Sequence, residues 1–248
     1  MGLIKTESDL IKMREPNKIL KDLLILLGEK VKAGVSTLEL DELFYSYVKK
    51  YNAEPSFLGY NGYPASLCIS LDNEVVHGIP RKDKIIQENQ IVSIDAGVYL
   101  NGFHADAARS YLTENASEDK KQLVKVTEES FFKGIENIKE GSHLYDIGAG
   151  VQEYAESYGY SVVRALVGHG IGKRMHEEPS VPNYGRRGTG MKLRAGMTLA
   201  IEPMINMGGY DVKVLSDGWT VVTLDGKPSA HYENTVAITK DGVEILTL

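Results

Sequence analysis

The chain has 248 residues, 42% of them apolar and 25% charged, which is the composition of a globular protein with a large hydrophobic core. Its formal net charge of -6 argues against a specific nucleic-acid partner and against attraction to anionic membranes. The single cysteine, Cys68, excludes an intramolecular disulfide. Charged residues interrupt any signal-peptide core near the N-terminus, so we expect a cytoplasmic protein.

Apolar periodicity and turn residues predict helices that precede strands in each half of the chain. Pro16 is expected either in a first helical turn or at a kink. The predicted elements are, in chain order, helices over 6–33 and 37–51, strands near 67–71, 91–100 and 103–112, helices over 117–139 and 143–158, and short strands with glycine-rich turns from 160 onward. This order favours an α+β fold with antiparallel sheet over a doubly wound one.

The two halves of the chain resemble each other at an offset of 107 residues. Lys32-Ala33-Gly34 precedes one predicted helix, and Lys139-Glu140-Gly141 precedes the other. The apolar positions that repeat are Leu40, Phe44, Tyr47 and Tyr51 in the first half and Ile147, Val151, Tyr154 and Tyr158 in the second. Helical periodicity alone would produce part of this match. We interpret it as an internal duplication within one domain, 1–248, with halves of about 1–115 and 116–248.

Two aspartates lie in the predicted hairpin IDAGVYLNGFHAD, residues 94–106. Asn101-Gly102 is the favoured pair for a two-residue turn, and a turn there places Gly97 opposite Asp106 and Ala108 opposite Asp95. The two carboxylates are then diagonal neighbours, roughly 7–8 Å apart at the backbone. Gly97 is expected to leave open space above the sheet. A shared cation would remove the repulsion, whereas two solvent-facing aspartates are the alternative.

Four further residues extend this pattern toward a metal site. His169 and His176 lie in the irregular stretch GHGIGKRMHEEP, and Glu202 and Glu233 lie in apolar, strand-like surroundings. A glutamate in such a run is disfavoured unless it is paired or coordinated. Each residue alone could be a surface histidine or an edge charge. Together with the hairpin they suit two divalent ions roughly 3.5–4 Å apart.

Five motifs in order give the chain a specific resemblance over almost its whole length. They are NEVVHGIP (73–80), SIDAGVYLNGFHAD (93–106), GHGIGKRMHEEP (168–179), IEPM (201–204) and DGWTVVTLDGKPSAHYENT (217–235). On these motifs the chain resembles the type I methionine aminopeptidases, a family of metallopeptidases with the pita-bread fold. That resemblance implies pseudo-twofold halves and a curved, mainly antiparallel sheet covered by helices on its outer face.

The resemblance also implies a reaction and a role for each matching residue. The implied activity is removal of the N-terminal methionine from nascent proteins and peptides, with a small second residue preferred, by a metal-bridged hydroxide. Two divalent ions (Co, Mn, Fe or Zn) would be needed. The implied metal ligands are Asp95, Asp106, His169, Glu202 and Glu233, with Asp106 and Glu233 bridging both ions. The implied catalytic residues are His77, His176 and Glu202, the last as a proton shuttle.

A side-chain pocket for methionine is the remaining implied feature. Besides His77 and His176, the candidate substrate-binding residues are Phe57, Tyr60, Tyr63, Cys68, Met175 and Trp219. Their alternative role is that of ordinary core or surface side chains. The implied partners are N-terminal peptides of nascent chains, with a transient ribosome contact, and we expect a monomer.

Five positions near the motifs depart from the pattern common in bacterial relatives, namely Ala96, Gly97, Ala107, His231 and Asn234. None of them removes a ligand, but groups around a metal site tune its affinity. Two other functions stay open at this point. One is an aminopeptidase or dipeptidase that acts on Xaa-Pro bonds, and the other is a non-catalytic binding protein of the same fold.

Overall fold

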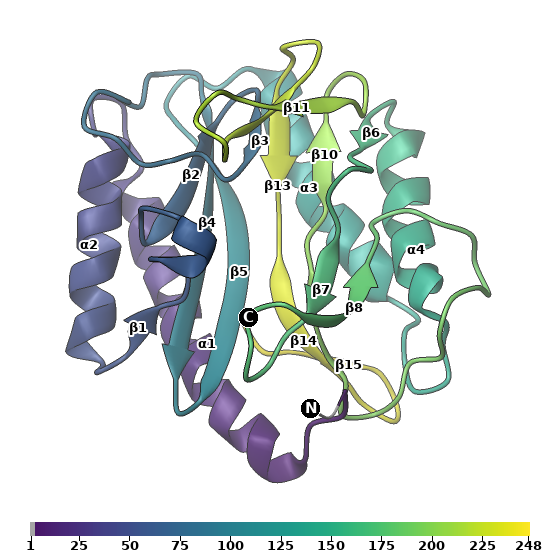
Figure 1. The fold of residues 1–248 in the computed structure, drawn as a ribbon. Helices are drawn as coiled ribbons and strands as arrows, with labels where there is room; N and C mark the ends of the chain where they lie inside the picture. The colour runs from purple at the N-terminus through teal and green to yellow at the C-terminus, as the bar shows by residue number, and fades with distance from the viewer. Residues whose placement is uncertain (1–2) are drawn as a thin grey trace.

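A computed structural model describes residues 3–248 of the chain (Figure 1). The described residues contain four α-helices, α1 (Glu7–Lys30), α2 (Thr37–Lys50), α3 (Glu118–Ile135) and α4 (Leu144–Ser157). The predicted helices are therefore confirmed, with ends that differ by up to four residues. A short 3-10 turn, Tyr60–Gly62, lies in the loop between α2 and the first long strands.

Local signals account for the start of α1. The Thr6 side chain accepts a hydrogen bond from the Asp9 backbone N–H, and the Asp9 carboxylate accepts one from the Thr6 N–H in return. Pro16 lies inside the helix rather than in its first turn. The helix stays continuous because its buried leucine face, including Leu20 and Leu24, packs on the sheet.

Antiparallel strands form the rest of the described fold, in four sheets. The strands are β1 (Glu54–Pro55), β2 (Leu67–Leu71), β3 (Glu74–Val76), β4 (Ile91–Leu100), β5 (Phe103–Leu112), β6 (Ser161–Val162), β7 (Gly168–Gly170), β8 (Glu177–Val181), β9 (Thr198–Ile201), β10 (Met204–Asn206), β11 (Val212–Val214), β12 (Val221–Thr223), β13 (Ser229–His231), β14 (Asn234–Ile238) and β15 (Val243–Ile245). The sheet orders are β1-β4-β2 with β5 on β4, β13-β10-β6, β11-β12-β3 and β15-β14-β9-β7-β8. The α+β, mainly antiparallel fold predicted from the sequence is confirmed.

Helices cover these strands from one side. α1 lies against the β4–β5 hairpin, α2 lies beside α1 against β1 and β2, and α3 and α4 lie against the C-terminal strands, as Figure 1 shows. The three largest apolar clusters follow this arrangement, with one under α1 and α2 and two under α3 and α4. Within 3–248, no helix is long and apolar enough to cross a membrane.

The β4–β5 hairpin has the predicted register. Asp95 pairs with Ala108, and Gly97 pairs with Asp106, around the turn at Asn101-Gly102. The prediction that Gly97 leaves open space above the sheet is wrong. A Cβ at this position would lie 2.7 Å from the Ser56 Cβ and 2.9 Å from a ring carbon of Phe57. Because Gly97 has no side chain, Ser56 and Phe57, which precede the 3-10 turn, can pack directly against the hairpin.

The two halves match closely where the repeat was predicted. Helix α2 begins at Thr37 and ends at Lys50, and the same offset of 107 residues leads to Leu144 and Ser157, the two ends of α4. An isolated bridge joins Ser36 to Ile85 before α2, and the equivalent bridge joins 143 to 192 before α4. These correspondences support the duplication, which stays a prediction.

Candidate active site

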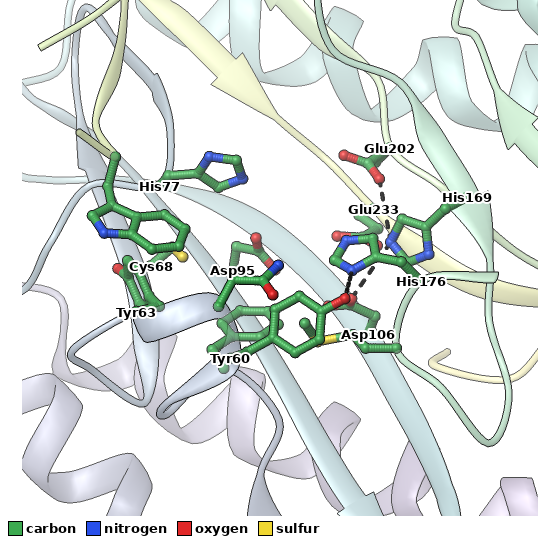
Figure 2. A pocket seen from close by; sticks show the side chains of 14 residues that line it. Tyr60, Tyr63, Cys68, His77, Asp95, Asp106, His169, His176, Glu202 and Glu233 are labelled. Carbon is green, nitrogen blue, oxygen red and sulfur yellow. Dashed lines mark hydrogen bonds and ion pairs between the residues drawn. The ribbon is translucent and has the colours of Figure 1, made fainter.

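Strands from both halves supply the five candidate metal ligands. Asp95 lies on β4 and Asp106 on β5, while His169 lies on β7. Glu202 follows the end of β9, and Glu233 lies between β13 and β14. Figure 2 shows all five side chains converging from the two sheets. The site thus depends on the junction between the hairpin and the C-terminal strands.

Backbone and hydroxyl hydrogen bonds make that junction. The Glu233 N–H donates to the Ala108 carbonyl over 3.0 Å. Two residue pairs away, the Thr235 hydroxyl donates to the Asp106 carbonyl over 2.8 Å and accepts from the Asp106 N–H at 3.1 Å. Arg109 donates to the Glu233 carbonyl as well. These bonds hold Asp106 and Glu233 next to each other, although the two residues are more than a hundred positions apart in the sequence.

Three of the five candidates form a compact cluster. One ligand atom each from Asp106, His169 and Glu233 lies within 4.8 Å of the others. The His169 Nε2 atom is 3.8 Å from Asp106 Oδ2 and 3.7 Å from Glu202 Oε1. Its Nδ1 atom lies 2.9 Å from the Gly170 carbonyl, so Nδ1 carries the proton and Nε2 keeps a free lone pair toward the acids.

The chemistry of this donor set fits divalent cations. Asp95 Oδ1, Asp106 Oδ1 and Glu233 Oε1 are buried and have no hydrogen-bond partner among the described residues. An unpartnered buried carboxylate is costly unless a cation or a proton satisfies it. Oxygen and imidazole donors together suit transition metals such as Mn, Fe, Co and Zn. The residues present therefore fit a metal centre.

Burial raises the pKa of every acid in the cluster, and neighbouring carboxylates raise it further for Asp106, Glu202 and Glu233. Burial raises the pKa of Asp95 to about 7. For Asp106 and Glu233, burial and then neighbouring carboxylates hold the pKa well above its usual range. Burial, with His176 nearby, lowers the pKa of His169 to about 4, so its imidazole is neutral and able to bind a metal at neutral pH.

A pH dependence of the metal-free protein follows from Asp95. Its pKa of about 7 in the folded protein lies above the roughly 3.9 of an unfolded chain. The folded state then binds more protons, so the stability contributed by Asp95 falls as the pH rises from about 4 to 7. In chelator-treated protein, Asp95→Asn is expected to remove this contribution to the pH dependence of stability. The unfolding free energy of the variant minus that of the parent should therefore be larger at pH 8 than at pH 5.

Urea unfolding at both pH values measures this difference. Returning a divalent ion should restore stability to the parent at pH 8 and much less to the variant, because a neutral amide is a poorer ligand than a carboxylate. The prediction fails if the parent and the variant show the same change in unfolding free energy between pH 5 and pH 8.

Beside the acids, the cavity has an apolar end. Phe57, Tyr63, Cys68 and Met175 are buried in one hydrophobic cluster, with Trp219 packed against it. The Tyr63 and Trp219 rings meet edge to face with centroids 5.0 Å apart. The whole cavity has a volume of about 230 Å³, below the roughly 300–1,000 Å³ of sites for drug-sized ligands. It suits one amino-acid residue rather than a long segment.

Two histidines face each other across the cavity (Figure 2). His176 precedes β8, and its Nδ1 lies 2.7 Å from the Tyr60 hydroxyl. His77 follows β3 with a positive φ of 60°, an uncommon backbone conformation that directs its ring into the cavity. Burial lowers the pKa of His77 to about 4 and also lowers that of His176. Both rings are therefore neutral at neutral pH.

All thirteen residues predicted for the site line this one cavity. They are Phe57, Tyr60, Tyr63, Cys68, His77, Asp95, Asp106, His169, Met175, His176, Glu202, Trp219 and Glu233. Their individual roles stay predictions. Asn61, which was not predicted from the sequence, also lines the cavity and has a positive φ of 49°. Its position before Gly62 was a turn signal that could have pointed to it.

The positions that depart from the common pattern lie around the ligands rather than among them. Ala96 pairs with Ala107 on the buried back face of the hairpin, in the core cluster under α1. The side-chain oxygen Oδ1 of Asn234 accepts hydrogen bonds from the Arg109 guanidinium and the Thr247 hydroxyl. His231 is buried with its Nε2 4.0 Å from Glu233 Oε2. The alanines are small because α1 packs there, which is a structural reason unrelated to the metal.

Known proteins resemble this chain over its full length. It is 56% identical over 248 residues to a methionine aminopeptidase of Clostridium perfringens, covering 100% of this chain and 99% of that protein. The crystal structure of methionine aminopeptidase from Rickettsia prowazekii has a TM-score of 0.97 at 45% identity and covers 99% of both chains.

A more distant structure shares only the fold. A Xaa-Pro dipeptidase from Bacillus anthracis matches with a TM-score of 0.80 at 23% identity, over 99% of this chain but 62% of that one. The sequence model of metallopeptidase family M24 matches residues 11–240. A buried cluster of acids and an imidazole from both halves, set on this fold, is what a metallopeptidase requires. The chain belongs to metallopeptidase family M24.

Proposed function

We propose that this protein is a metal-dependent aminopeptidase that removes an N-terminal methionine from peptides and nascent proteins and prefers a small second residue. The observation that carries the proposal is the shape of the cavity. Its acidic end holds the candidate metal ligands, and its other end is lined by aromatic and sulfur-containing side chains. A thioether side chain is apolar and polarisable and packs well against such rings.

Asp95, Asp106, Glu202, Glu233 and His169 would hold the two divalent ions that this proposal requires. When bound, the ions lower the pKa of a coordinated water and polarise the carbonyl of the bond to be cleaved. Glu233 Oε1 is buried and has no hydrogen-bond partner among residues 3–248, so this oxygen is free to bind a metal ion. A free substrate amine near the acids restricts cleavage to the end of a chain.

The two histidines act on the peptide itself. His176 is fixed at Nδ1 by the Tyr60 hydroxyl, so its Nε2 is the atom available to the oxygen of the scissile carbonyl. A hydrogen bond there strengthens as negative charge develops on that oxygen. His77, on the opposite wall, is placed near the leaving amide. Glu202 takes the proton from the attacking water and delivers it to the leaving amine.

The preference for a small second residue follows from the walls of the cavity. Tyr60 and His176 are joined by a hydrogen bond, and their rings lie 5.2 Å apart, so they narrow the opening beyond the first substrate residue. A transient ribosome contact, a monomeric state and a cytoplasmic location stay expectations from the sequence.

Cleavage before proline is the alternative activity within the family. The Xaa-Pro dipeptidase structure is matched over only 62% of its length and at 23% identity. The apolar end of the cavity, with Met175 and Trp219, favours a first-residue side chain of methionine type. A non-catalytic protein is disfavoured because all five candidate ligands line the cavity.

Peptide hydrolysis before and after metal removal tests the proposal. Chelated protein is expected to lose activity on Met-Gly-Met and to regain it when Co, Mn, Fe or Zn ions are returned one at a time. Met-Phe-Met should be cleaved at least about tenfold more slowly, and Ala-Pro-Ala should not be cleaved measurably. Cleavage of Ala-Pro-Ala faster than that of Met-Gly-Met would establish the Xaa-Pro activity instead. If no peptide were hydrolysed with any of the ions, the proposal that the protein is a peptidase would be refuted.

A further inference from the structure

A buried ion pair lies directly behind the loop that carries His176. The Lys5 ammonium is 2.8 Å from Glu177 Oε2, and the two side chains are only 7% and 9% exposed. Among the ion pairs that lysine and arginine make within 3–248, no other has both partners so little exposed. Removing one member of such a pair leaves an uncompensated buried charge.

The lysine belongs to the segment before α1, which is itself fixed. The Lys5 N–H donates to the Gly196 carbonyl over 2.7 Å, and Ile4 forms an isolated bridge with Met197 before β9. The lysine stem passes close to Gly172, where a Cβ would lie 2.4 Å from Lys5 Cε. Gly172 thus leaves room for the lysine to reach Glu177 beneath the loop.

Glu177 in turn holds the 172–177 loop together. Its second oxygen, Oε1, accepts from the Arg174 N–H at 3.1 Å. The Gly172 N–H donates to the Arg174 carbonyl at 3.1 Å, and the His104 N–H donates to the Gly172 carbonyl at 2.8 Å. The loop is therefore closed by one carboxylate that bridges the Lys5 ammonium and a loop N–H.

Glu177 is the first residue of β8, and His176 directly precedes it at the end of the 172–177 loop. Glu177 points back to Lys5, and His176 points into the cavity, where its one side-chain hydrogen bond is to Tyr60. We infer that Lys5 is a positioning residue for His176, acting through Glu177 to set the backbone from which the imidazole reaches the substrate. The inference rests on the proposed function of that site.

Lys5→Met tests this inference because it removes the ammonium and keeps most of the stem. We expect kcat on Met-Gly-Met to fall about tenfold, with a KM change under about threefold, since a displaced catalytic group loses rate more than binding. In a His176→Ala background the same substitution should change kcat less than about twofold. Glu177→Gln, which keeps the hydrogen-bonding shape but not the charge, should give the same pattern.

A readout that does not need activity separates this inference from the proposed function. Carbon-13 relaxation of the His176 ring should show exchange broadening in Lys5→Met that is absent from the parent. Lys120→Met is the matched control, because it breaks a 2.6 Å pair with Asp72 remote from the loop and should leave both the ring and kcat unchanged. Equal kcat losses in both backgrounds, or an unchanged His176 ring, would overturn the inference. A parent without hydrolytic activity but with the ring effect would refute only the proposed function.

Discussion

Replacing Glu233 by glutamine is expected to lower kcat/KM on Met-Gly-Met by about 10³-fold or more and to weaken divalent-metal binding. Glu233 is 2% exposed, and its Oε1 has no partner among the described residues. The amide keeps the volume of the side chain but loses the negative charge that a shared ligand must supply. Substituting a residue that only hydrogen-bonds to a metal ligand already lowers metal affinity or activity roughly 10–100-fold. Loss of a ligand itself should therefore lower them more.

Metal titration by calorimetry and peptide hydrolysis together measure this effect. Asp41→Asn is the matched control, because Asp41 is also a buried acid but already accepts from the N–H groups of Ser66 and Leu67. Asparagine can accept the same two bonds, so metal affinity should be unchanged and activity should stay within about threefold. Wild-type metal affinity in Glu233→Gln would remove Glu233 from the metal centre.

The hairpin shows how far the sequence could predict the site. One local signal, Asn101-Gly102, sets the turn, and a strand period of two then determines that Asp95 and Asp106 share a face. The other ligands could be recognised only as misplaced polar residues in apolar runs. Their meeting depends on pairing between residues 108 and 233, which no local pattern specifies.

Long-range packing explains what the sequence did not predict. The space above Gly97 is filled because a segment 40 residues earlier returns to the hairpin, and a glycine by itself cannot reveal what approaches it. The pair of Lys5 and Glu177 joins residues 172 positions apart, and each looks like an ordinary surface charge in the sequence. Three-residue strands such as β10 are too short to show a periodicity of their own.

The neutral imidazole of His176 leads to the second large effect. His176→Ala is expected to lower kcat on Met-Gly-Met by about 10²–10³-fold, the loss typical when one donor to a developing oxyanion is removed. Its ring centroid lies 4.2 Å from that of His169, yet its Nδ1 is paired with Tyr60 and the ring belongs to the substrate side of the cavity. Metal affinity should therefore be retained, in contrast to Glu233→Gln.

Comparing the loss of kcat with the loss of metal affinity decides whether His176 contacts the substrate or binds the metal. His104→Ala is the matched control, since His104 is a nearby half-buried histidine that pairs with the Ser56 hydroxyl and does not line the cavity. Its backbone bond to Gly172 survives the substitution, so kcat should change less than about threefold. If His176→Ala lost metal affinity in proportion to rate, His176 would be a ligand. Because Tyr60 occupies Nδ1, Tyr60→Phe should reproduce part of the loss in kcat, roughly tenfold, and leave metal binding intact.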